Sequence, residues 1–258
     1  LESYPELIAR EDRDIAASVK ETLEKKGIVF RMNAKVQSVK HEEDKAIVAF
    51  TDLQTNGVFE LDAEAVLLAT GRRPNTGGLN LEAAGVEVDV RGAIIVDEYL
   101  KTTNPNIRAV GDVKGGLQFT YISLDDYRIV REDLFGDKER KTNDRNPVSY
   151  SVFIDPPLAR IGLNEEEACK QNLDIIVKKL PAMAIPRAKT LGEMDGLLKA
   201  IIDKNTGKIL GCMLFAPDSG EVINTVAIAM KAGLDYTFLR DFIFTHPSMS
   251  EALNDLFS

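Results

Sequence analysis

A histidine near the C-terminal end of the sequence is the side chain best suited to proton transfer. His246 is one of only two histidines, and it directly precedes Pro247 in the stretch FTHPSMSEALND (244–255). A glutamate, Glu251, follows five positions later. Imidazole has the one unperturbed side-chain pKa close to neutrality, so a histidine can act as general acid or base at physiological pH. The stretch is therefore a candidate for half of an acid–base site.

The same stretch also fits an ordinary helix start. Ser248 and Glu251 have the S-x-x-E spacing of a capping box, in which Glu251 accepts a backbone hydrogen bond at the start of a helix through Leu256. Because caps far outnumber catalytic dyads, the residues alone favour the cap. The two roles are expected to compete for one carboxylate.

Two strand-like runs end in glycines that would let a ligand approach the backbone. Gly71 ends the run AVLLATG, and Gly111 precedes Asp112 in the run IRAVGD. An aspartate at the end of a strand can accept hydrogen bonds from a sugar hydroxyl. The first amides of the following helix, at 118–120, would favour negative charge. A flavin suits this arrangement, and a plain strand–turn–helix fits the residues equally well.

Composition argues against several classes of function. The chain of 258 residues is 44% hydrophobic with a net charge of -9, which suits a globular protein and disfavours a nucleic-acid surface. No apolar run approaches the roughly 20 residues that span a bilayer. Cys169 and Cys212 have no metal-site or redox spacing, so we predict two reduced, buried cysteines in a cytoplasmic protein and no metal site.

The N-terminal half contains the elements that would carry the glycines. Residues 12–26 have helical periodicity, and four short strand-like runs follow as an antiparallel meander. These runs are 28–32, 34–40, 45–50 and 57–62. The runs at 66–68 and 107–112 are apolar on both faces, which is typical of central strands in a parallel sheet. A helix is predicted at 119–135, and the charged stretch 136–147 reads as an exposed linker with a domain boundary near 146.

The C-terminal part has a different pattern, with strands and helices that predict an α+β unit. Strand-like runs occur at 148–154, 158–163, 174–180, 197–203 and 209–216. Asn164 is a candidate N-cap for a short helix at 164–172, and 219–233 is a strongly apolar helix. We therefore expect an antiparallel sheet with helices packed on it.

Three motifs together resemble one enzyme family. VLLATGRRPNT (66–76), TTNPNIRAVGDV (102–113) and THPSMSEAL (245–253) are similar, in this order and spacing, to the pyridine nucleotide–disulfide oxidoreductases. These FAD-dependent reductases include glutathione reductase, lipoamide dehydrogenase and mercuric reductase. QFTYISLDDYRI and HPSMSEALNDLF look closest to the bacterial reactive-chlorine-resistance flavoproteins of that group. The similarity covers essentially the whole chain.

The resemblance implies a mixed α/β and α+β fold in three parts. Residues 1–61 would be the C-terminal half of the NAD(P)-binding domain, 62–146 the returning part of the FAD-binding domain, and 147–258 a complete dimerisation domain. The sequence contains no GxGxxG and no CxxxxC, which the family carries. The sequence also does not begin with Met. We therefore expect a C-terminal portion of a longer polypeptide, inactive by itself.

The resemblance also implies roles for the candidate residues. His246 would be the acid–base that reaches the flavin and thiols of the other subunit, and Glu251 would hold its imidazole. A cis bond before Pro247 is usual in the family. With this resemblance, the dyad is favoured over the cap. The cofactor-binding residues would be Thr70, Gly71, Gly111, Asp112, Gln118, Phe119 and Thr120.

The implied activity is a redox one, with a role in redox homeostasis. FAD and NAD(P)H would be the cofactors, and electrons would pass through a redox disulfide outside this chain to a disulfide, metal ion or other oxidant. The protein would be a cytoplasmic homodimer, and the presence of His246 argues against a mercury specialist. The alternative is an autonomous dimerisation module without catalysis, because the helix at 222–230 is apolar almost all round.

Overall fold

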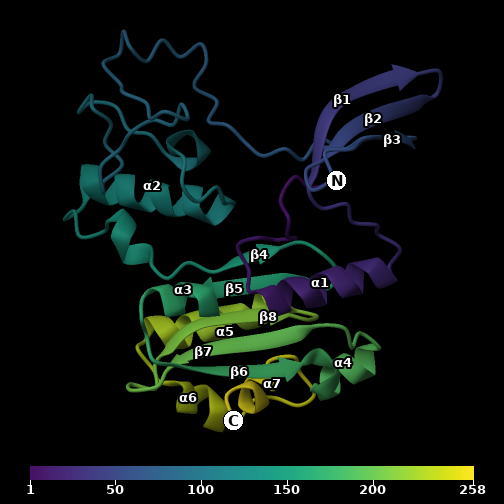
Figure 1. The fold of residues 1–258 in the computed structure, drawn as a ribbon. Coiled ribbons are helices and arrows are strands. Elements are labelled where there is room, and N and C mark those ends of the chain that lie inside the picture. The colour runs from purple at the N-terminus through teal and green to yellow at the C-terminus, as the bar shows by residue number, and fades with distance from the viewer. The chain divides into compact units, whose positions relative to one another are not determined.

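The chain divides into two units, and the computed structural model describes all 258 residues. One unit joins Leu1–Val66 to Pro147–Ser258, and the other is Leu67–Asn146. Helices combine with antiparallel sheets, which agrees with the predicted mixture of α/β and α+β structure (Figure 1). None of the helices has the length and apolar character needed to cross a bilayer.

A five-stranded antiparallel sheet is the centre of the first unit. Its strands run in the order β4-β5-β8-β7-β6. They are β4 (Tyr150–Val152), β5 (Leu158–Gly162), β6 (Ile175–Pro181), β7 (Leu197–Asp203) and β8 (Ile209–Phe215). β5, β7 and β8 are buried along nearly their whole length. Because helices cover both faces of the sheet, the buried residues of these central strands are apolar except for Arg160 of β5 and Lys199 of β7.

One face of this sheet is covered by the C-terminal helices. α5 (Ser219–Lys231) and α7 (Ala252–Leu256) share one apolar core with the strands, and α6 (Tyr236–Asp241) contributes Leu239 to it. The short α3 (Glu165–Lys170) starts at the predicted cap Asn164, which accepts a hydrogen bond from the amide of Glu167. α4 (Pro186–Leu191) follows the 3-10 turn η3 (Ala182–Ala184).

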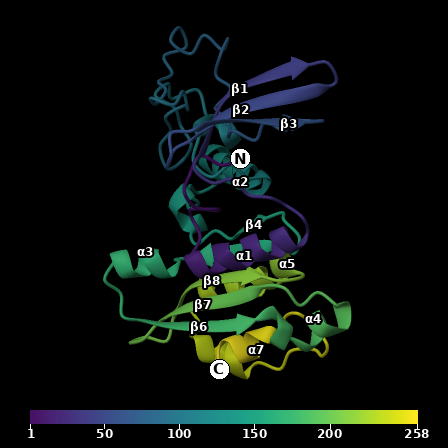
Figure 2. The same cartoon turned by 45° about the vertical axis from the view of Figure 1, so that its right-hand side comes forward.

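The opposite face is covered by α1 (Arg13–Lys25), the helix predicted at 12–26 (Figures 1 and 2). Ile15 and Val19 are fully buried against the core formed by residues such as Met213 and Phe215. A helix predicted to come from a nucleotide-binding segment thus packs on the C-terminal sheet. The two stretches 1–66 and 147–258 form one compact unit for this reason.

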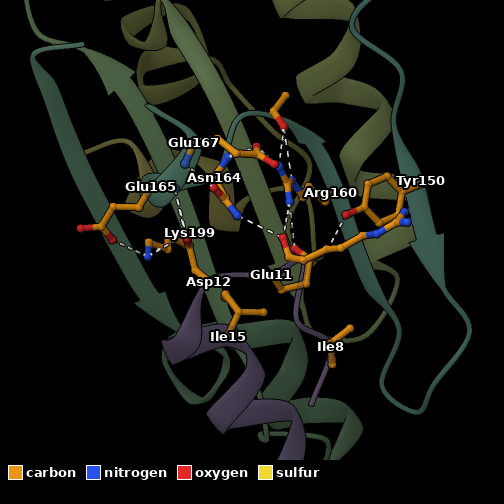
Figure 3. Close-up of polar contacts among 12 residues, drawn as sticks. Ile8, Glu11, Asp12, Ile15, Tyr150, Arg160, Asn164, Glu165, Glu167 and Lys199 are labelled. Atoms are coloured by element: carbon orange, nitrogen blue, oxygen red, sulfur yellow. Dashed lines mark hydrogen bonds and ion pairs between the residues drawn. The ribbon is translucent and has the colours of Figure 1, made fainter. Parts of the chain in front are cut away.

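A buried polar network joins the start of α1 to the sheet (Figure 3). Lys199 of β7 is 1% exposed, and its Nζ lies 2.8 Å from Asp12 and 2.6 Å from Glu165. Arg160 of β5 pairs with Glu167 and donates to the carbonyl of Arg10 at 2.8 Å. Buried charges are tolerated only when opposite charges and hydrogen bonds surround them, and here both conditions are met.

The predicted meander forms with three strands. β1 (Ala34–Glu42), β2 (Lys45–Asp52) and β3 (Val58–Ala63) pair in antiparallel order. One of the four predicted strands, at 28–32, does not form, because these residues have no strand partner.

The second unit departs further from the sequence predictions. The expected central strands at 66–68 and 107–112 do not form, and Leu67 is 90% exposed. A strand requires a neighbour to take its backbone hydrogen bonds, and Leu67–Asn146 supplies only isolated bridges such as Lys101–Arg108. The predicted helix forms as α2 (Thr120–Phe135), after the 3-10 turn η1 (Gly111–Lys114).

The stretch expected to be an exposed linker also folds back on its unit. Residues Thr142–Arg145 form a second 3-10 turn, η2, and the side chain of Arg145 is only 11% exposed. Arg145 pairs with Asp125 and Asp126 of α2. Most of the segment 136–147 is exposed, as expected, and the boundary between the two units falls at Asn146. Arg145 departs from this pattern because the buried carboxylates of α2 hold its guanidinium.

The two cysteines differ in their surroundings. Cys212 of β8 is fully buried, and burial raises the pKa of its thiol. Cys169 of α3 is exposed, so the prediction of two buried cysteines is wrong for this residue. Both are free thiols.

Candidate active site

His246 and Glu251 are in direct contact. The Nδ1 atom of His246 lies 2.7 Å from Oε2 of Glu251. The imidazole is exposed, whereas the carboxylate is mostly buried, with side-chain exposures of 68% and 16%. A ring held through Nδ1 leaves Nε2 for proton exchange with a group outside this turn. The geometry is that of an oriented imidazole at the protein surface.

The other oxygen of Glu251 completes the capping box. Its Oε1 accepts the backbone N–H of Ser248 at 3.4 Å, and the amide of Glu251 donates to the hydroxyl of Ser248 at 3.3 Å. The expectation that cap and dyad compete for one carboxylate is therefore wrong, because each oxygen has its own partner. The box closes the turn that leads into α7, which itself begins at Ala252.

The turn that carries His246 is fixed from both sides. The bond between His246 and Pro247 is cis, as the family resemblance implies. The hydroxyl of Ser248 donates to the carbonyl of Thr245 at 2.6 Å. On the inner side, Met249 and Leu253 are buried in the core of the five-stranded sheet.

Asn254 is a positioning residue that sequence reasoning missed. Its Nδ2 lies 3.0, 2.8 and 2.8 Å from the backbone carbonyls of Leu239, Arg240 and Phe242. It thereby ties the end of α6 to α7 and sets the path of the chain into the His246 turn. An asparagine inside a helix, where it is disfavoured, is the only sequence signal for this role.

The second group of candidate residues lies in the other unit. Thr70 and Gly71 are exposed in a segment without regular structure. Gly71 has a φ of +102°, and no atom lies within 4 Å of where a Cβ would be. Its backbone is therefore open to a ligand. The positive φ is a conformation that glycine adopts without strain.

Gly111 lies close to α2. It is buried with a φ of +70°, and a Cβ here would lie 2.9 Å from Oγ of Ser123 in α2. The missing side chain thus leaves room for Ser123, and the predicted approach of a ligand to the Gly111 backbone stays a prediction. Its amide donates to the buried carboxylate of Asp126 at 2.8 Å, a contact that sequence reasoning also missed.

Asp112 and the start of α2 are brought together by Arg72. The guanidinium of Arg72 lies 3.8 Å from Oδ2 of Asp112 and 3.5 Å from the carbonyl of Gln118. Asp112 is half exposed. The residues at 70–72, 112 and 118 therefore share one surface of this unit.

The N-terminus of α2 is suited to an electron-rich group. Phe119 occupies the N-cap without a side-chain cap, and the first turn has no acidic residue. The ring of Phe119 stacks on that of Tyr121, with centroids 5.1 Å apart. The helix dipole favours negative charge at this end. An open glycine backbone, an exposed aspartate and an uncapped helix start fit a flavin.

Two family models match the chain. The model described as "Pyridine nucleotide-disulphide oxidoreductase, dimerisation domain" matches residues 148–257. The model described as "Pyridine nucleotide-disulphide oxidoreductase" matches residues 1–126.

Similar proteins cover the chain almost completely. The "Probable pyridine nucleotide-disulfide oxidoreductase RclA" of Escherichia coli K12 is 51% identical over 100% of this chain and 57% of its own length. A mercuric reductase of Bacillus cereus is 34% identical over 96% of this chain and 39% of its own length. The solved "HOCl-induced flavoprotein disulfide reductase RclA" of E. coli superposes with a TM-score of 0.94 at 49% identity, covering 99% of this chain and 57% of that chain. The chain thus spans little more than half of RclA.

Proposed function

The chain belongs to the pyridine nucleotide-disulphide oxidoreductase family, and from this premise we propose that it is the C-terminal part of an FAD-dependent, NAD(P)H-using oxidoreductase. Electrons would pass from NAD(P)H through the flavin and a redox disulfide outside this chain to the acceptor. When bound, the flavin supplies the two-electron relay between nicotinamide and disulfide. The acceptor would be a disulfide, a metal ion or another oxidant, in a cytoplasmic homodimer.

The contact between His246 and Glu251 is the observation that carries this proposal. The Nδ1–H of His246 would donate to Glu251, so that Nε2 carries the lone pair and can take a proton from a thiol. Glu251 would stabilise the imidazolium that results, as the orienting carboxylate does in other acid–base sites. His246 would then return the proton to the reduced substrate. The exposure of the imidazole suits a thiol that the partner subunit presents.

The cofactor residues have a supporting role in the proposal. Asp112 would accept hydrogen bonds from the ribityl chain, and the amides at 118–120 would face the electron-rich edge of the flavin. Thr70 and Gly71 would line the approach of the cofactor. The open backbone at Gly71 and the uncapped start of α2 support this assignment.

We propose the same three-part organisation as the sequence predicts. Residues 1–61 would belong to the nucleotide-binding domain, 62–146 to the FAD-binding domain and 147–258 to the dimerisation domain. The dimerisation model, matched at 148–257, supports the last assignment. The packing of α1 on the C-terminal sheet places residues of the first and third parts in one apolar core.

The proposal is tested by the intact mass and absorbance spectrum of the protein purified from its natural source. We expect a flavin absorbance band and a polypeptide heavier than the 28.5 kDa of this chain. Reduction of the band by NADH or NADPH would identify the donor. A protein of 28.5 kDa that neither contains nor binds flavin would contradict the proposal.

A dimerisation module without catalysis is the second candidate. The predicted all-round apolar helix forms as α5, which buries Val222, Ile223, Val226 and Ala229 but leaves Ile228 70% exposed. That exposed side chain and the dimerisation match favour self-association. A natural protein with no flavin that sediments as a dimer would support this candidate over the enzyme.

A further inference from the structure

A buried carboxylate holds the turn that carries Asp112. The side chain of Asp126 in α2 is fully buried, and its Oδ2 accepts the backbone N–H of Gly111 at 2.8 Å. Gly111 is the first residue of η1, and Asp112 is the second. The orientation of Asp112 is thus linked to a side chain one and a half helical turns into α2.

The same carboxylate also binds the other end of this turn. Lys114, the last residue of η1, places its Nζ 3.4 Å from Oδ2 of Asp126, and the lysine side chain is only 10% exposed. Arg145 lies 2.8 Å from Oδ1 of Asp126. Two cations at these distances offset the cost of burying the carboxylate, and its Oδ2 accepts the backbone N–H of Gly111. Asp126 is therefore a fixed acceptor for Gly111.

The turn is also restricted sterically by α2. A Cβ at Gly111 would lie 2.9 Å from Oγ and 3.6 Å from Cβ of Ser123, so the turn lies close to the helix. The hydrogen bond and the lysine pair attach both ends of η1, while the carboxylate of Asp112 remains half exposed. Loss of Asp126 would release both ends of the turn and, with them, the position of Asp112.

We propose that Asp126 is a positioning residue for the cofactor: it fixes the Gly111–Lys114 turn so that Asp112 is pre-oriented toward the ribityl chain of the flavin. The inference rests on the proposed function, because it takes Asp112 as a flavin contact. Asp126 is buried and lies outside the residues assigned to the cofactor surface, so it would act without touching the ligand. Pre-orientation of this kind raises affinity by removing the cost of ordering the turn upon binding.

Asp125 is a matched control on the same helix. It is buried next to Asp126, pairs with Arg140 and shares Arg145 with Asp126. It makes no hydrogen bond to the η1 turn. An effect that arises only from the loss of a buried charge should appear in both aspartates, whereas an effect on the turn should appear only in Asp126.

The test is FAD affinity, measured by titrating deflavinated complete protein with FAD. Asp126→Ala should weaken FAD binding about tenfold or more, the factor expected for a lost hydrogen bond to a charged group. Asp126→Asn retains an acceptor oxygen and should lose less, whereas Asp125→Asn should stay within about twofold of the wild type. Hydrogen exchange at the Gly111 amide of the apoprotein should accelerate about tenfold in Asp126→Ala and not in Asp125→Asn.

The outcomes separate this inference from the proposed function. A wild-type protein that does not bind FAD contradicts the proposed function itself. Wild-type binding with equal affinity in Asp126→Ala, or an equal loss in Asp125→Asn, overturns the inference alone. If Asp126→Ala does not fold, Asp126→Asn decides: unchanged affinity together with unchanged Gly111 exchange overturns the inference.

Discussion

Glu251 gives a different partner to each of its carboxylate oxygens. One oxygen holds the ring of His246, and the other accepts the amide of Ser248. Substitutions can separate the two roles because the hydroxyl of Ser248 serves only the turn. The proposed catalytic role of Glu251 and its structural contribution are therefore measurable independently.

Glu251→Gln should lower turnover while preserving the fold. The amide can still accept from Ser248, so the free energy of unfolding should change by less than about 1 kcal/mol. Loss of the negative charge beside the imidazolium should reduce acceptor-linked turnover by about tenfold or more. Ser248→Ala is the comparison: it should lower the unfolding free energy by about 1 kcal/mol and reduce turnover less than Glu251→Gln does, because it retains the contact between His246 and Glu251. Equal turnover in wild type and Glu251→Gln would show that Glu251 is only a cap.

Asp133 of α2 makes a pH-dependent contribution to stability. Its buried carboxylate lies 2.9 Å from Nζ of Lys101 and 3.1 Å from Nε of Arg108. Burial raises the pKa of this carboxyl, but the two cations outweigh burial and hold the pKa below its ordinary value of 3.8. Since the pKa is lower in the folded state, the stabilisation is complete above pH 3.8 and is lost as the pH falls below it.

Asp133→Asn should therefore destabilise the protein at neutral pH and much less in acid. The expected loss near neutrality is about 1.5–3 kcal/mol, from broken hydrogen bonds to charged groups. Urea unfolding of wild type and variant, at neutral pH and again below pH 3.8, measures both differences. A difference that stays constant across this range would mean that the ionised carboxylate does not stabilise the fold.

Only part of the candidate site could be predicted at the residue scale. The contact between His246 and Glu251 was predicted only through the family resemblance, because the residues alone favoured a helix cap at Glu251. Asp126 could not be predicted, since an Asp-Asp pair within a helix normally indicates a solvated face. The cations that pair with it, Lys114 and Arg145, lie 12 and 19 positions away in the sequence and reach it only in the folded chain.

At the scale of elements, α2 has an unusual distribution of side chains. Its buried residues include Asp125, Asp126 and Asp133, whereas Leu124 and Tyr127 are exposed. Amphipathic helices ordinarily show the reverse. The buried carboxylates on this face are paired with cations from other parts of the unit. Hydrophobic periodicity therefore predicted where this helix lies in the sequence but not which of its faces is buried. The reason is that apolar side chains are exposed here, as they are at Leu67 and Leu68.

The contact of α1 with the sheet depends on Lys199. Lys199→Met should reduce the free energy of unfolding by about 3–5 kcal/mol, because Asp12 and Glu165 would be left without their buried cation. Lys25→Met is the control, since Lys25 is exposed and its ion pairs should contribute no more than about 1 kcal/mol. Chemical denaturation measures both variants. Equal stability of the two variants would contradict a role for the network in holding α1.

At the scale of the whole molecule, sequence patterns predicted the antiparallel C-terminal sheet and the helices α3, α5 and α7, but neither α4 and α6 nor the packing partner of α1. Strand alternation and caps such as Asn164 are local signals, so they can be read without the fold. The packing of α1 on the sheet is not local. It joins residues that are more than 130 positions apart, for example Arg10 and Arg160. The runs at 66–68 and 107–112 had strand character but no neighbour with which to pair.

Self-association is a prediction at this scale. A dimerisation domain matched at 148–257 predicts that the purified 258-residue chain forms a dimer. Sedimentation equilibrium at micromolar concentration should give a mass of about twice 28.5 kDa. A monomer at this concentration would show that the domain does not dimerise in this chain.

We propose that His246 exchanges the proton of the thiol step and takes no part in the reduction of the flavin. The most direct measurement is stopped-flow absorbance of the two half-reactions in the complete flavoprotein, comparing wild type with His246→Gln. The rate of flavin reduction by NAD(P)H should stay within about twofold, whereas reoxidation by a disulfide acceptor should slow by about 100-fold or more. Equal rates of both half-reactions in the two proteins would contradict a role of His246 in the thiol step.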